Sequence, residues 1–160
     1  MHSSSSRRSA ESVPFYAARL GHWLSQATRL DLDALGFGVI EVDDDGVVVF
    51  YNRFESDFTG MAPKDVVGRS FFTDVAPCTN NPLFFGRFRE GLTQDDYDAT
   101  LRYTLTYRLR PTLVNVRIIR HDGRNWILVT PNTRRDAVGS RIAVSQRIHN
   151  VREIREGGGR

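Results

Sequence analysis

The clearest hydrophobic pattern lies late in the chain, where apolar and polar residues alternate from position 99 to position 110. Such alternation predicts a long strand with one face buried and the other in water. Pro111 ends this strand, an apolar run follows over residues 113–120, and a turn at 121–124 leads to another run over 125–130. This part of the chain therefore predicts three strands joined by short turns.

Two more strands are predicted earlier, over residues 37–42 and 47–51. The sequence Asp43-Asp44-Asp45-Gly46 between them is a strong turn signal and predicts a hairpin. Three short helices interrupted by glycines are then predicted, over residues 52–58, 63–67 and 82–90. This order indicates an α+β protein with a central antiparallel five-stranded sheet and short helices on one face.

The two ends of the chain have different patterns from the middle. Irregular apolar positions in residues 1–34 predict one or two helices that pack on the domain as a cap. Residues 131–160 predict a basic amphipathic helix, because apolar residues from Val144 to Ile154 recur at helical spacing with arginines between them. We therefore expect an N-terminal extension and cap at 1–34, a core at 35–130 and a C-terminal extension at 131–160.

Composition narrows the function classes. A chain of 160 residues with 40% hydrophobic content can form one core without disulfides or metals. It has neither a stretch of membrane-spanning length nor the apolar segment of a secretory signal, so a cytoplasmic protein without membrane association is expected. The net charge is only +3 and the excess arginines follow residue 131 without interleaved aromatics, so nucleic-acid binding is not expected. The histidines show no metal-ligand spacing, so no metal site is expected either.

Cys78 is the only cysteine in the chain, so it cannot form an internal disulfide. Pro77 before it and a helix start expected at residues 79–82 would fix the backbone, and the N-terminus of a helix would stabilise a thiolate. On these residues alone, the thiol is a buried apolar group, an intermolecular bridge or an attachment point.

Several short motifs in the middle of the chain occur in one register. They are Tyr51-Asn52 followed by Glu55, Asp57-Phe58-Thr59-Gly60, the run from Val67 to Thr79 that contains Cys78, the run from Phe85 to Gly91, and Tyr103-Thr104. Together they resemble the photoactive yellow protein family, which consists of blue-light receptors with a PAS fold. The resemblance extends from about Leu32 to Leu109 and continues through Trp126 with a shortened final hairpin.

The resemblance implies that p-coumaric acid (4-hydroxycinnamic acid) is bound covalently as a thioester on Cys78. It also implies that Tyr51 and Glu55 hold the phenolic end of this group, with Thr59 supporting them. Because Tyr51 and Glu55 stand four residues apart, a helical turn would put both side chains on one face. Glu55 must be protonated to donate a hydrogen bond, and burial favours this by raising the pKa of a carboxyl group. The other residues expected around the group are Met61, Phe71, Val75, Ala76, Pro77, Tyr103, Leu105 and Tyr107.

Two positions depart from the family pattern. Met61 stands where the best-known members have an arginine that shields the phenolic end, and a methionine supplies neither that charge nor its hydrogen bonds. Leu109 replaces a methionine associated with thermal re-isomerisation. We therefore expect a changed colour and a slower return to the dark state.

The resemblance favours a photoreceptor that is not an enzyme. Light would isomerise the bound group, Glu55 would lose its proton, and the unpaired buried charge would loosen the N-terminal cap. The partner would be a signalling protein not identified by the sequence, with a homodimer through the terminal helices as a second arrangement.

Two other functions remain open. The first is a PAS module for protein interaction or dimerisation that carries no chromophore. The second is an enzyme with Cys78 as nucleophile and Glu55 as base, which is less favoured because no histidine stands in a readable relation to Cys78.

Overall fold

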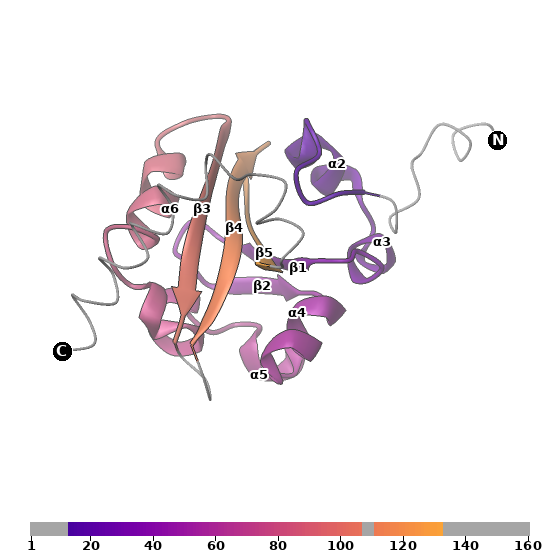
Figure 1. The fold of residues 1–160 in the computed structure, drawn as a ribbon. Coiled ribbons are helices and arrows are strands. Elements are labelled where there is room, and N and C mark those ends of the chain that lie inside the picture. Colours follow the sequence, from indigo (N-terminus) through magenta and orange to yellow (C-terminus); the bar gives the residue numbers. More distant parts are fainter. Residues whose placement is uncertain (1–12, 107–110, 133–160) are drawn as a thin grey trace.

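The computed structural model describes residues 13–106 and 111–132 (Figure 1). Within these residues five strands form one antiparallel sheet in the order β2-β1-β5-β4-β3. The strands are β1 (Gly38–Val42), β2 (Val48–Tyr51), β3 (Tyr97–Leu105), β4 (Thr112–His121) and β5 (Arg124–Pro131). The predicted α+β class and five-stranded antiparallel sheet are thus confirmed.

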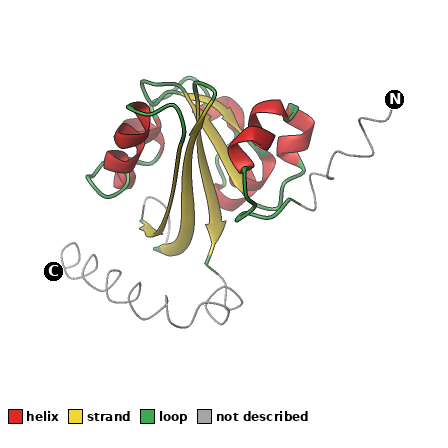
Figure 2. Cartoon of the chain, turned by 90° about the horizontal axis from the view of Figure 1, so that it is seen from above, coloured by secondary structure: helices red, strands yellow, loops and turns green. Residues whose placement is uncertain are grey.

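Short helices lie on both sides of this sheet (Figure 2). The N-terminal cap contains α2 (Leu20–Gln26) and α3 (Arg29–Asp33). The segment between β2 and β3 contains α4 (Arg53–Thr59), α5 (Pro63–Val66), the π-helical turn η2 (Phe71–Val75), the 3₁₀ turn η3 (Pro77–Thr79) and α6 (Phe85–Leu92). Among the described helices, none is long and apolar enough to cross a membrane.

The sheet separates two hydrophobic cores. On one face Ile40, Ile118 and Ile127 pack with Phe71, Phe84 and other residues of the β2–β3 segment. On the opposite face Val39, Trp126 and Leu128 pack with Leu20 and Leu24 of the cap. The sequence predicted short helices on one face of the sheet and a cap whose position it did not specify. Because successive strand residues point to opposite faces and are apolar on both, the cap covers the second face.

Some predicted boundaries were wrong. The helix expected from residues 79–82 starts later, at Phe85, because the backbone oxygen of Asn81 accepts from Gly86, five residues on, and residues 82–84 form a turn. Cys78 therefore lies in a 3₁₀ turn and not beside the N-terminus of an α-helix. The strand expected to extend to residue 110 is observed from Tyr97 to Leu105. Tyr107, Leu109 and the amphipathic segment beyond residue 132 lie outside the described residues.

Candidate functional site

The first part of the site is formed where β2 passes directly into α4. Asn52 begins the helix because its side-chain oxygen accepts from the backbone N–H of Glu55 at 3.0 Å. This sharp start places Tyr51 at the end of the strand, and it buries Glu55 and Thr59, one helical turn apart, on the inner side of α4. All three side chains named for the phenolic end are therefore turned into the protein.

Glu55 carries a buried carboxyl group with one oxygen atom that lacks a hydrogen-bond partner. Its side chain is almost fully removed from solvent, and its Oε1 atom has no hydrogen-bond partner in the described structure. Burial raises the pKa of Glu55 from 4.5 to about 8, so the group is mainly protonated at neutral pH. A neutral carboxylic acid can donate its proton, which makes Glu55 suited to bind an anionic oxygen in this core.

Tyr51 and Thr59 are joined at the same place. Their hydroxyl oxygens are 2.8 Å apart, and the Thr59 hydroxyl donates to the backbone oxygen of Glu55 at 2.9 Å. A threonine hydroxyl has one proton, so Tyr51 is the donor in its bond with Thr59. Thr59 also accepts from the backbone of Met61 at 3.2 Å, which fixes the turn after α4. In this structure Thr59 thus orients the Tyr51 hydroxyl, which is what a supporting residue is expected to do.

Cys78 forms the second part of the site, on the η2–η3 turns. It is half-buried and packs against the same core as Tyr51. Its carbonyl oxygen accepts hydrogen bonds from the Tyr103 hydroxyl at 2.6 Å and from the Asn81 amide at 3.1 Å. Burial raises the pKa of Tyr103, so this hydroxyl stays protonated and donates at neutral pH. The backbone that carries the lone thiol is therefore held by two side chains.

One apolar core joins the two parts. Of the residues predicted around the bound group, Phe71, Val75, Ala76, Tyr103 and Leu105 are buried in it together with Tyr51, and Met61 and Cys78 pack at its edge. Pro77 is exposed, so it restricts the turn before Cys78 and does not line the core. The structure therefore brings the predicted residues to one face of the sheet, except Pro77 and the undescribed Tyr107.

The sequence did not predict two important neighbours of the site, Gly38 and the buried Asn52. Gly38 on β1 lies directly against the Glu55 carboxyl group, which would overlap with a Cβ atom at this position. Asn52 is fully buried, and besides capping α4 its amide donates to the backbone oxygens of Leu32 and Phe37. The signal for Asn52 was present in the sequence, since asparagine before a predicted helix is a common N-cap. The role of Gly38 depends on a contact between separate elements and has no local signal.

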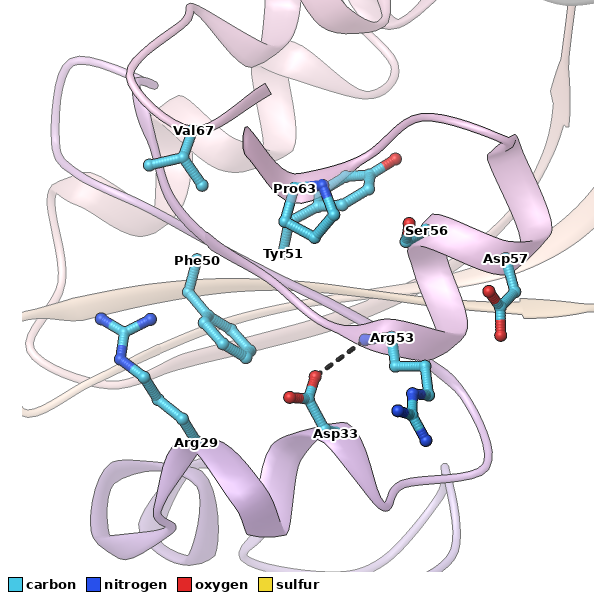
Figure 3. Close-up of a pocket in the computed structure, with 9 residues that line it drawn as sticks. All are labelled: Arg29, Asp33, Phe50, Tyr51, Arg53, Ser56, Asp57, Pro63 and Val67. Carbon is cyan, nitrogen blue, oxygen red and sulfur yellow. Dashed lines mark hydrogen bonds between the residues drawn. The ribbon is translucent and has the colours of Figure 1, made fainter. Parts of the chain in front are cut away.

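A groove of about 420 Å³ lies on the outer side of α4, next to the cap (Figure 3). Its walls include Arg29 and Asp33 from α3, and Arg53 and Pro63 from α4 and α5. Across its floor the Asp33 carboxylate accepts from the backbone N–H of Arg53 at 2.8 Å. Neither Glu55 nor Cys78 lines this groove, but Tyr51 does, so the groove borders the core site at Tyr51.

The site is also tied to the cap. Asn52 contacts Leu32 of α3 through its amide and Glu55 through its side-chain oxygen, and Asp33 contacts Arg53. These bonds connect the first turn of α4, which carries Glu55, to the end of α3. A movement of that first turn would therefore change the hydrogen bonds that hold α3 of the cap.

The chain is similar to known proteins of one family and fold. The family model described as the PAS fold matches residues 28–151. The photoactive yellow protein of Halochromatium salexigens is 40% identical over 119 residues, which cover 73% of this chain and 95% of that protein. The photoactive yellow protein of Rhodothalassium salexigens is 44% identical over 89 residues, which cover 56% of this chain and 71% of that protein.

A solved structure shows the same likeness. The photoactive yellow protein domain of the sensor histidine kinase Ppr from Rhodospirillum centenum is 40% identical to this chain, with a TM-score of 0.64. The match covers 68% of this chain and 97% of that domain. From the fold, the arrangement of Tyr51, Glu55 and Cys78, and these relatives, we conclude that the chain belongs to the photoactive yellow protein family of PAS-fold proteins.

Proposed function

We propose that this protein is a blue-light photoreceptor that carries p-coumaric acid as a thioester on Cys78. The observation that carries the proposal is the Glu55 carboxyl group, which is buried, mainly protonated and without a partner for Oε1. It follows Tyr51 by four residues, and Tyr51 packs in the same core as the lone thiol. A buried polar atom without a partner is costly and is kept where it has a use. Hydrogen bonding to a ligand would satisfy it.

The residues of the core fit a flat aromatic group with one polar end. Phe71, Val75 and Leu105 provide apolar walls, and Glu55 provides a donor at one end. Tyr51 becomes the second donor when its hydroxyl proton turns from Thr59 to the ligand. Cys78 provides the nucleophile at the edge of the core, where its partial exposure leaves it open to reagents. This distribution of an apolar body, two donors and a thiol is what a hydroxycinnamoyl thioester requires.

Attachment is an acyl transfer. The Cys78 thiolate attacks the carbonyl carbon of an activated p-coumaroyl thioester, the new carbon–sulfur bond forms, and the donor's own thiol leaves and takes up a proton. The bonds that Tyr103 and Asn81 donate to the Cys78 carbonyl hold this backbone in place. The reaction occurs once per chain, so the protein has no turnover chemistry in this proposal.

The bound group supplies light absorption, an isomerisable double bond and a phenolic oxygen. Glu55 supplies the proton that this oxygen gains after illumination, which leaves a carboxylate in an apolar core. An unpaired buried charge is strongly unfavourable, so the first turn of α4 is driven to rearrange. Asn52 and Asp33 connect that turn to α3, and the cap is loosened as a result. We infer that a cytoplasmic signalling protein reads this change.

Reconstitution tests the proposal. After treatment with an activated p-coumaric acid, the intact mass should show one p-coumaroyl unit, the protein should turn yellow, and its absorption should change reversibly on blue illumination. Cys78→Ala is the control and should gain no covalent group. A wild-type chain without an adduct overturns the proposal. An adduct whose absorption does not respond to light would instead favour a PAS interaction module.

A further inference from the structure

The turn that carries Cys78 is closed by hydrogen bonds on both sides of the thiol. After it, the Cys78 carbonyl oxygen accepts from the Tyr103 hydroxyl at 2.6 Å and from the Asn81 amide at 3.1 Å. Before it, the Ala76 carbonyl oxygen accepts from the side-chain hydroxyl and the backbone N–H of Thr79, at 2.6 and 2.9 Å. Four hydrogen bonds on two carbonyl groups of this turn hold the backbone that directs the thiol in one conformation.

Asn81 joins this turn to two other elements. Its amide nitrogen donates to the hydroxyl oxygen of Tyr103 on β3 as well as to the Cys78 carbonyl oxygen. Its side-chain oxygen accepts from the backbone N–H of Phe84, directly before α6, at 3.0 Å. A side-chain amide has two N–H donors and one carbonyl acceptor, so both ends of the Asn81 side chain are in use. The position of the thiol is therefore linked to β3 and to the start of α6.

The Tyr103 hydroxyl is also close to the thiol itself. Burial is the main cause of the raised pKa of Tyr103, and the charge of a Cys78 thiolate raises this pKa as well. The hydroxyl therefore lies within electrostatic reach of the sulfur atom. Phe84 packs edge to face on the Tyr103 ring, with centroids 5.1 Å apart, and this contact holds the ring beside Cys78.

The donor at the other end of the proposed site is held as well. Asn52 caps the first turn of α4, which carries Glu55. The Glu55 carboxyl group lies so close to β1 that Gly38 has no room for a side chain. Cys78 and Glu55 are therefore both fixed in position. A group that is bound to the thiol and reaches Glu55 with its polar end must have one length.

We propose that Asn81 and Tyr103, the Cys78 clamp, are positioning residues that select the length of the acyl group bound to Cys78. This selection rests on the proposed function. For any donor the thiolate attacks the thioester carbonyl carbon, and the donor's thiol leaves and takes up a proton. Only a group of the right length also gains the hydrogen bond from Glu55 as the new bond forms. Without the clamp the thiol moves, so the p-coumaroyl group loses this advantage.

Acylation rates with two activated thioesters test the clamp. The full chain is treated with the p-coumaroyl or the shorter 4-hydroxybenzoyl thioester of the same thiol, and intact mass follows the adduct. Rates with N-acetylcysteine correct for the different reactivity of the two donors. The wild type should then prefer the p-coumaroyl group about tenfold or more, which is the effect expected of one hydrogen bond to a charged group.

Asn81→Ala and Tyr103→Phe should each lower the rate of p-coumaroyl transfer at saturating donor about tenfold, because the reacting atoms are no longer held in line. The half-saturating donor concentration should stay the same, since the apolar walls of the site are intact. The preference for the p-coumaroyl group should fall to about threefold. The acylated variants should also have a broader absorption band, because the phenolic oxygen meets Glu55 in more than one geometry.

Asn80→Ala and Tyr97→Phe are the matched controls. Asn80 is exposed next to Asn81, and Tyr97 lies on the same strand as Tyr103 but donates to Glu90. Both controls should keep the rate and the preference of the wild type. Circular dichroism checks that every variant is folded.

The clamp is overturned if either Asn81→Ala or Tyr103→Phe keeps the rate and the preference of the wild type. A wild type that accepts both groups equally well also overturns it, while attachment at Cys78 and the photoreceptor proposal stand. A wild type that neither donor acylates overturns the photoreceptor proposal, and the selection of acyl length falls with it. The two failures are thus distinguished by the wild-type adduct.

Discussion

The carboxyl group of Glu55 occupies the space that a side chain at Gly38 would need. An ideal Cβ atom at Gly38 would overlap with Oε1 of Glu55 and lie 3.0 Å from Cδ and 3.3 Å from Cβ of the same residue. Gly38 lies in β1 without a positive φ, so its backbone would tolerate other residues. Space for the Glu55 side chain is therefore the reason for a glycine at this position.

Gly38→Ala should displace the Glu55 carboxyl group without preventing folding. We expect the free energy of unfolding to fall by about 1–3 kcal/mol, which is typical of overpacking in a core. In the reconstituted protein the absorption maximum should move, because the donor to the phenolic end has moved. Gly36→Ala is the matched control: Gly36 has open space around it and should change stability by less than about 0.5 kcal/mol. Equal absorption spectra for both variants would contradict the assignment of Glu55 as the donor to the phenolic end.

The raised pKa of Glu55 makes the stability of the colourless chain depend on pH. The pKa of Glu55 is about 8 in the folded state, whereas its ordinary value of 4.5 applies to the unfolded state. Between pH 4.5 and 8 the folded protein therefore keeps a proton on Glu55 that the unfolded chain has released. The contribution of Glu55 to the free energy of unfolding is fully present below pH 4.5, and it is lost as the pH rises through 8. Each pH unit inside this window should remove up to about 1.4 kcal/mol.

Urea unfolding of the wild type and Glu55→Gln between pH 5 and 8.5 measures this effect. Glutamine does not titrate, so the difference in unfolding free energy between the two proteins isolates Glu55 from all other groups. The stability of the wild type relative to the variant should decline steadily with pH. A constant difference would show that Glu55 is ionised throughout the range.

Glu55→Gln should also change the reconstituted protein. We expect it to keep the covalent group and to absorb at longer wavelength, because an amide is a weaker donor than a carboxylic acid and stabilises the phenolate ground state less. In the wild type, infrared difference spectra should show a protonated-carboxyl band that disappears on illumination. If this band persists in continuous light, Glu55 is not the proton donor.

The sequence predicted the parts of this molecule that depend on local patterns. Alternation along residues 99–105 and the turn at Asp43–Gly46 led to the correct strands, and the neighbours of Cys78 led to the family. The predicted start of α6 was wrong because residues 82–84 form a turn that is closed by a backbone bond between Asn81 and Gly86, which no local pattern indicated. The contacts of Gly38 with Glu55 and of His22 with His121 join separate elements, so no local pattern contains them.

Arg117 should be the main polar anchor of the N-terminal segment. Its guanidinium group binds both carboxylate oxygens of Asp98, at 2.8 and 2.6 Å, and donates to the backbone oxygens of Phe15 and Ala17, both at 2.9 Å. Arg117→Met keeps an unbranched apolar stem but removes these donors, and we expect the free energy of unfolding to fall by about 2–3 kcal/mol. Hydrogen exchange over residues 13–27 should accelerate, while exchange in β5 should change less.

Arg120→Met is the control for this effect. Arg120 also lies on β4 and is mostly buried, but it binds Asp44, Asn125 and the backbone of Gln94, none of which belongs to the cap. It should leave exchange over residues 13–27 unchanged. Equal acceleration in both variants would mean that the sheet as a whole, and not the anchor, controls the cap.

Illumination should change the association state of the reconstituted protein. Loosening of the cap would expose the apolar face formed by Phe15 and Leu24 of the cap and Trp126 of the sheet, all of which are buried in the dark structure. The sequence after residue 132 predicts a basic amphipathic helix, and we expect this segment to pack on such a face in the same or a second chain. Sedimentation of the full chain and of a chain truncated after Asn132, each in the dark and in the light, measures this. We expect a light-dependent mass increase in the full chain only. Identical masses in all four samples would exclude the segment as a light-dependent contact between copies, and the search for the signalling partner would then turn to other proteins.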